Sequence, residues 1–480
     1  MRAIAKSLRS APGVWIGVFL YLSVVQSVMG AITMVASSYQ RTYASVQGDL
    51  HQDAENMVHM MEYLELPLTV IIGVFITLWV VSAAVRNQRK QLALLSMQGA
   101  TPSQLTLLTE AQVLILGIAA TVLSAVVDGF AVPPFFRYMT STYSDFADSY
   151  YYQPDVTAWL LGAGVGLATA AVGTALTVRA AAKVDPVEAY RPQAVSPKNP
   201  GWVRTLLSLS SFVGAIYVFV LPVWKVRRAS LSGGKAAMDA FNTDTSMVLT
   251  CAMGGLMLLM IAFAFLAPLL YGGLVRLWTQ LLPIPASPWV LAKRQTVSRI
   301  ERSSSVLAPL MACLGLIMGM GTPMQIYSAS LMKVAGYSTP PGTTSTGLAG
   351  ILGAVGPAAL IALGGALAGF CMISRERSFD QSLLDIAGAE PRQLRSMAVL
   401  EGSIIMFTAI LAAFLITIPA TASAYVGIRI MLGTGVLSVP WALWGWIALG
   451  VAILGSAIFF IASARALRTP SIAVIQLQAE

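Results

Sequence analysis

The chain has 480 residues, 30 basic and 21 acidic side chains, a formal net charge of +9 and a mean hydropathy of +0.73. Hydrophobic residues make up 56% of the chain and charged residues 11%, whereas a soluble domain has about 25% charged residues. This composition excludes a soluble enzyme, a disordered protein and a nucleic-acid-binding protein. A basic chain with so few charges is typical of a membrane protein whose Lys and Arg lie on one side of the bilayer.

Ten apolar runs are long enough to cross a bilayer, which takes about 20 mostly apolar residues. None contains an Asp, Glu, Lys, Arg or His. The first resembles a signal peptide but is too long for one, so we interpret it as an uncleaved span. We predict an all-α polytopic membrane protein with ten transmembrane helices, over Val14–Ala36, Leu66–Val85, Ala111–Val127, Val156–Val178, Thr205–Trp224, Ser246–Val275, Ser303–Leu331, Leu348–Ile373, Gly402–Val426 and Val439–Ser463.

The basic residues predict the orientation. With ten spans, 22 of the 30 basic residues lie in the termini and in the loops that share their side of the membrane. Because cytoplasmic loops are enriched in Lys and Arg, we expect both termini in the cytoplasm. The expected location is the bacterial plasma membrane.

A twelve-residue pattern, L-L-x-x-x-G-A-x-P-x-Q-L, occurs twice. One copy follows the second span, from Leu94 to Leu105, and the other follows the eighth, from Leu383 to Leu394. An even number of spans separates the two copies, so they predict two parallel four-span repeats related by an axis along the membrane normal. We predict a first four-span unit at residues 1–192, a linking two-span hairpin at 193–287 and a second four-span unit at 288–480.

Each copy predicts a short cytoplasmic helix, a sharp bend and a second helix that runs into the next span. Gly99 lies where a helix end requires a left-handed residue. Thr101 then acts as an N-cap, Pro102 fits the first turn, and Gln104 closes a capping box. Glu390 takes the place of the threonine in the second copy. The alternative is an amphipathic elbow that only lies at the membrane surface.

These elbows resemble the FtsX-like permease family, the membrane subunits of MacB-type ABC transporters. The resemblance rests on the Leu-rich short helix, the Gly-Ala pair, the polar helix start and a glutamate at the start of the next span, here Glu110 and Glu401. It also rests on the tail from Pro186 to Arg191. It covers spans two to four and eight to ten with their elbows, about half of the chain.

The resemblance implies that each short helix is a coupling helix that contacts a separate ATPase subunit. Two elbows in one chain match the two copies of a homodimeric ATPase. The family's acidic residue before the Leu-rich segment is replaced by Gln91 in the first copy, and the tail of the second, Pro470 to Ile475, lacks the Glu and Arg. The implied contact residues are Gln91, Leu92, Leu94, Leu95, Gly99, Ala100, Pro102 and Gln104 in the first elbow, and Asp380, Leu383, Leu384, Gly388, Ala389, Pro391 and Gln393 in the second.

The sequence contains no G-x-x-x-x-G-K-[ST] motif to hold ATP phosphates. We therefore expect no cofactor in this chain and expect ATP and Mg²⁺ in the partner ATPase. No catalytic constellation and no metal site is predicted, since the three cysteines lie in apolar runs without the paired spacing of a zinc site. Spans without ionisable groups also argue against an ion-driven secondary transporter.

The outside loop from Pro133 to Asp155 is acidic and aromatic. It is either a mouth for a cationic amphipathic molecule, through Asp145, Asp148, Tyr150 and Tyr151, or an aromatic belt at the membrane surface. We favour the belt, because aromatic belts are general.

The predicted function is that of a non-enzymatic ABC permease subunit. It would couple ATP hydrolysis in the partner to export or membrane extraction of an amphipathic peptide, lipid or antibiotic. The expected partners are the ATPase, the lipid bilayer and this compound, with no nucleic acid. The alternatives are a non-transporting transducer that relays ATPase motion to an outside partner and, third, a secondary transporter.

Overall fold

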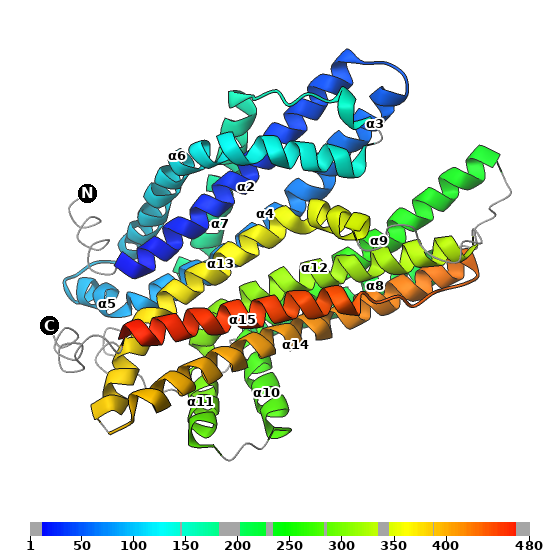
Figure 1. Cartoon of the computed structure of the whole chain (residues 1–480). Coiled ribbons are helices and arrows are strands. Elements are labelled where there is room, and N and C mark those ends of the chain that lie inside the picture. Colours follow the sequence, from blue (N-terminus) through cyan, green and yellow to red (C-terminus); the bar gives the residue numbers. More distant parts are fainter. Residues whose placement is uncertain are drawn as a thin grey trace. The chain divides into compact units, whose positions relative to one another are not determined.

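A computed structural model describes residues 12–144, 146–181, 202–226, 234–282, 286–334, 345–386 and 388–466. Over these residues the regular structure is entirely helical (Figure 1). Ten of the helices found there are long and apolar enough to cross a membrane. The predicted all-α polytopic fold with ten spans is thus confirmed, while the arrangement in two parallel repeats stays a prediction.

The longer helical elements up to residue 181 are α2 Pro12–Ser45, α3 Asp49–His59, the π-helical segment η1 Met60–Glu65, α4 Leu66–Asn87, α5 Arg89–Met97, α6 Pro102–Tyr143 and α7 Val156–Ala181. A short 3₁₀ turn, η2, covers Ala147–Ser149. The later helices are α8 Trp202–Lys225, α9 Gly234–Phe265, α10 Ala267–Gln280, α11 Ser287–Ser298, α12 Ile300–Val334, α13 Ser345–Ile386, α14 Pro391–Leu432 and α15 Trp441–Ala466.

The chain forms two compact units, and three of its helices contribute to both. Unit 1 comprises residues 1–196, 356–399 and 458–480, and unit 2 comprises residues 197–355 and 400–457. The predicted boundaries at 192/193 and 287/288 delimit repeats in the sequence and stay a prediction.

Unit 1 is built around α2, α4, α6 and α7, which pack side by side (Figure 1). Glycines allow α7 to approach its neighbours closely: a Cβ atom at Gly162 would lie 2.6 Å from the carbonyl oxygen of Met29 in α2. A Cβ atom at Gly173 would lie 2.6 Å from Cβ of Thr77 in α4. Small residues of this kind let membrane helices pack backbone to backbone.

Polar side chains also link the helices of unit 1. The carboxylate of Asp128 in α6 is buried and accepts hydrogen bonds from Ser27 Oγ in α2 and from Trp159 Nε1 in α7, the latter at 2.9 Å. Tyr21 in α2 donates to the carbonyl oxygen of Gly73 in α4 at 2.9 Å. Buried polar groups need such partners, so these bonds fix the helices in register.

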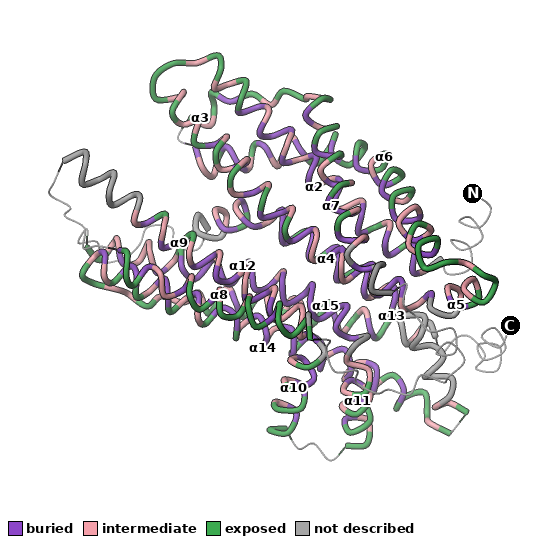
Figure 2. The backbone as a smooth tube through the Cα atoms, turned by 180° about the vertical axis from the view of Figure 1, so that it is seen from behind, coloured by how far each residue is buried: buried purple, intermediate pink, exposed green. Residues whose placement is uncertain are grey.

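Unit 2 has an interior formed by α8, α9, α12 and α14. Its apolar cluster consists of Val226, Val248, Ala252, Ile326, Ala424, Ile428 and Met431. In the most apolar window of α12, 83% of the residues are buried, against 17% in that of α15. Helix α12 is therefore central and α15 presents most of its surface outward, as the burial colours also indicate (Figure 2).

The predicted sixth span, Ser246–Val275, is wrong in its extent. Helix α9 ends at Phe265, Leu266 leaves the helical conformation with φ −101° and ψ 16°, and α10 begins at Ala267. Pro268 explains the break, because proline supplies no N–H and clashes with the preceding turn of a helix. The tail of the run belongs to α10, where Trp278 Nε1 donates to Thr408 Oγ1 of α14 at 3.0 Å.

Candidate functional site

The first elbow begins where α4 ends. Asn87 closes α4, Gln88 turns the chain with φ −100° and ψ 3°, and α5 follows as a separate short helix. Ala93 faces inward with 3% exposure, whereas Leu94 and Met97 are 49% and 48% exposed. The two exposed side chains are three residues apart, so they share one face of the helix. The short helix predicted here is confirmed, and it presents apolar side chains outward.

The bend after α5 is a complete Schellman motif. Gly99 has φ +95°, a left-handed conformation. Its N–H donates to the carbonyl oxygen of Ser96 at 3.0 Å, and the N–H of Ala100 donates to that of Leu95 at 3.1 Å. These are the two bonds that define the motif. The predicted role of Gly99 as a left-handed helix end is confirmed.

Helix α6 restarts the chain with a capping box. The side chain of Thr101 accepts from the N–H of Gln104 at 3.4 Å, and the N–H of Thr101 donates to Gln104 Oε1 at 3.0 Å. Pro102 occupies the first turn. The predicted capping box is confirmed, and it holds the start of α6 directly against the bend.

The second elbow repeats the same backbone geometry. Gly388 has φ +91°, its N–H donates to the carbonyl oxygen of Asp385 at 3.0 Å, and the N–H of Ala389 donates to that of Leu384 at 3.0 Å. The N–H of Glu390 donates to Gln393 Oε1 at 3.3 Å, which is half of a capping box. Two bends with the same hydrogen bonds support the predicted repeat.

The second elbow differs from the first in the helix before the bend. Helix α13 runs without interruption from Ser345 to Ile386, so the separate short helix predicted for the second copy is wrong. Asparagine is a weaker helix former than glutamate, and Asn87 at the break in the first copy corresponds to Glu376 in the second. The glutamate at this one position therefore favours continuation of the helix in the second copy.

The structure places most predicted contact residues at the surface of the two elbows. Asp380 and Leu383 lie in α13, but their side chains are outside the described residues, as are the tails at Pro186–Arg191 and Pro470–Ile475. The exposed predicted residues are Leu94, Gly99, Pro102, Gln104, Gly388, Pro391 and Gln393, and the half-buried ones are Gln91, Leu92, Leu95, Ala100, Leu384 and Ala389.

The mouth proposed at Asp145, Asp148, Tyr150 and Tyr151 stays a prediction. Tyr151 and Asp148 are exposed, and Asp145 lies outside the described residues. Tyr150 is buried and donates to Asp53 Oδ2 at 2.8 Å. Burial and the Asp53 carboxylate raise the pKa of Tyr150 above its ordinary value, so its phenol stays a hydrogen-bond donor within the fold.

One acidic residue has an environment that the sequence did not indicate. Glu65 ends the π-helical segment η1 and is fully buried, and among the residues that the structure describes neither of its carboxylate oxygens has a hydrogen-bond partner. An unpaired buried carboxyl group is costly, and π-helical turns are frequent at functional sites.

Comparison with protein families matches residues 66–186 to the family described as FtsX-like permease C-terminal. The match runs from the start of α4 through the first elbow and the whole of α6 and α7. No curated protein matches the sequence. The predicted resemblance is confirmed over this segment, and the permease and membrane character follows from it. The chain is therefore a multi-pass membrane protein in which residues 66–186 are similar to the C-terminal part of FtsX-like permeases.

Proposed function

We propose that this chain is the permease subunit of an ABC transporter and that it takes up mechanical work from a separate ATPase through its two elbows. The observation that carries the proposal is the Schellman bend at Gly99, repeated bond for bond at Gly388. Surface loops without a mechanical role vary freely in geometry, so a shared left-handed bend supports a shared task.

The first elbow has the features of a docking lever. Leu94 and Met97 project from α5, outside the spans, and suit an apolar groove on a partner. The Schellman motif and the capping box at Thr101 leave no free joint between α5 and α6. A displacement of α5 would therefore move α6, which crosses the membrane.

The partner would supply the chemistry. ATP and Mg²⁺ would be held by a homodimeric ATPase, whose two copies offer one docking surface to each elbow. This chain would contribute no cofactor and no catalytic residue. The excess of basic residues on the side of the elbows supports a cytoplasmic position for them and for both termini in a bacterial plasma membrane.

The energy of ATP hydrolysis would drive the export of an amphipathic compound or its extraction from the membrane. Spans without ionisable residues suit a path along lipid-facing surfaces better than an aqueous pore, because charges inside a membrane usually mark hydrophilic pathways. A peptide, a lipid and an antibiotic all have the required amphipathic character.

Reconstitution of the full chain with its ATPase in proteoliposomes tests this function. Stimulation of ATP hydrolysis by a compound, together with its ATP-dependent movement across the bilayer, is the expected result. Stimulation without movement would contradict transport and identify a transducer. Movement driven by an ion gradient without the ATPase would contradict the proposal and identify a secondary transporter.

A further inference from the structure

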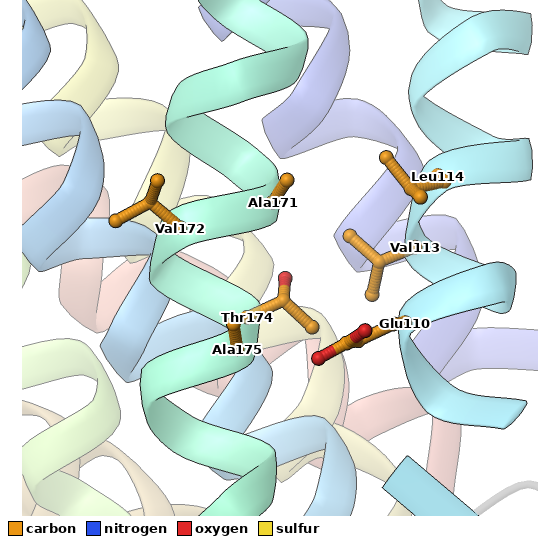
Figure 3. A pocket seen from close by; sticks show the side chains of 7 residues that line it. All are labelled: Glu110, Val113, Leu114, Ala171, Val172, Thr174 and Ala175. Atoms are coloured by element: carbon orange, nitrogen blue, oxygen red, sulfur yellow. The ribbon is translucent and has the colours of Figure 1, made fainter. Parts of the chain in front are cut away.

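An apolar groove separates α6 from α7 in unit 1 (Figure 3). Its cavity has a volume of about 260 Å³. The lining residues are Glu110, Val113 and Leu114 of α6 and Ala171, Val172, Thr174 and Ala175 of α7. Leu114 and Val172 are 38% and 50% exposed, so the groove opens on the outer surface of these spans. In a membrane that surface faces lipid chains.

The groove contains one ionisable group. The Glu110 side chain points into the space between the helices, toward Thr174 and Ala175 (Figure 3). Thr174 donates its hydroxyl proton to the carbonyl oxygen of Ala170 at 2.7 Å. Within the part of the chain that the structure describes, no side chain forms a hydrogen bond or an ion pair with the Glu110 carboxylate.

The groove is amphipathic along the direction of α6. Glu110 lies eight residues after Pro102 at the first elbow, about 12 Å at the rise of an α-helix. Val113 and Leu114 lie one turn farther into the predicted span. With the elbow on the cytoplasmic side, the carboxylate is at the level of the inner headgroups, and the apolar wall points toward the bilayer centre.

We propose that this groove binds a membrane amphiphile of the cytoplasmic leaflet that has a cationic amine head and an apolar chain. The negative charge of Glu110 complements an amine, and a carboxylate at the edge of the hydrocarbon is stabilised by a cation. The volume is below the range of about 300–1,000 Å³ for drug-sized pockets, so the groove holds one chain.

The proposal goes beyond the permease function, because binding to α6 and α7 requires no ATPase. The position in the second copy that corresponds to Glu110 is Val399, and the glutamate of that copy, Glu401, lies two residues farther along the helix. The two glutamates are therefore not at equivalent positions.

Photolabelling of the full chain in phosphatidylcholine nanodiscs tests the proposal. Three probes share one long alkyl chain with a diazirine and differ only in the head: an amine, an alcohol or a sulfate. Labelled peptides are identified by mass spectrometry. We expect the amine to label the α6 and α7 peptides about fivefold more than the sulfate, the scale of a partly exposed charge pair.

Two pairs of variants separate the charge of the groove from its volume. Glu110→Gln should abolish the preference for the amine, whereas Glu55→Gln, the same change in α3, should leave it intact. Ala171→Leu should reduce labelling by all three probes, whereas Ala119→Leu on the exposed face of α6 should not. Equal labelling by amine and sulfate, or an amine preference that survives in Glu110→Gln, would overturn the proposal. Neither result would argue for or against ATPase coupling at the elbows.

Discussion

Replacing Gly99 by valine tests whether the bend of the first elbow transmits motion. A Cβ atom at Gly99 meets nothing within 4 Å, so the substitution creates no clash. What it changes is the backbone, because Gly99 has φ +95° and a branched side chain disfavours positive φ. The perturbation is therefore confined to the shape of the elbow.

The backbone penalty sets the size of the effect. A left-handed conformation costs an L-residue about 1–2 kcal/mol, which changes a population ratio by a factor of about 5–30. Asparagine tolerates this region better than other residues with a side chain. Gly99→Asn is thus a matched control that adds a side chain while preserving the bend.

The assay is the ATPase rate of the full complex in nanodiscs, with thermal unfolding of the permease measured in parallel. We expect Gly99→Val to insert and fold while its coupled ATPase activity falls by a factor of about 5–30, and Gly99→Asn to retain most of the activity. Gly388→Val should act in the same way. Full coupling in both valine variants, or equal loss of activity in the asparagine variant, would show that the left-handed bend does not transmit motion.

Three further predictions concern stability. Gly162→Ala should lower the free energy of unfolding by about 1–3 kcal/mol through overpacking against α2, whereas Gly164→Ala, whose Cβ meets nothing within 4 Å, should not; equal melting temperatures would contradict this. Glu65→Met should raise that free energy by about 1–3 kcal/mol, since it removes a buried carboxyl group that has no hydrogen-bond partner among the described residues; a lower free energy of unfolding in chemical denaturation would contradict this. Hydrogen bonds lower the pKa of Asp155, and the bond from the Thr157 hydroxyl contributes most. The ionised Asp155 therefore stabilises the fold at neutral pH. This stabilisation is lost as the pH falls from the ordinary pKa of 3.8 through the lowered pKa of the folded protein. The melting temperature of Asp155→Asn should be below that of the wild type at neutral pH, and the two should converge in acid. A difference in melting temperature that grows in acid would contradict this.

The features predicted correctly from the sequence depend on neighbouring residues. The bend at Gly99 and the capping box at Thr101 and Gln104 are formed by hydrogen bonds over five residues or fewer. Local motifs of this type are encoded by residue identity at fixed spacing. The ten spans follow from hydropathy, since an uninterrupted apolar run has few alternatives to a membrane helix.

The features that the sequence did not reveal depend on competing local preferences or on tertiary packing. A hydropathy pattern does not detect the helix-breaking effect of Pro268. The apolar run across Leu266 therefore predicted one continuous span where the structure has a break between two helices. Glu65 directly precedes the apolar run of the second span, but α3 and η1 continue that span as a helix, and the Glu65 side chain is buried. Tyr150 is buried, and its hydroxyl donates a hydrogen bond to Asp53, which is distant in the sequence.

The most direct test of the coupling proposal is photocrosslinking from the two elbows in native membranes. A photoreactive amino acid is placed at Leu94 in α5 or at Ile386 before the second bend, which are 49% and 59% exposed. Tyr63, which is 73% exposed in η1, is the control at the far end of unit 1. We expect Leu94 and Ile386 to crosslink to an ATPase with a Walker motif, identified by mass spectrometry, and Tyr63 not to do so. No ATPase adduct from either elbow, or an equal adduct from Tyr63, would show that the elbows are not the docking sites.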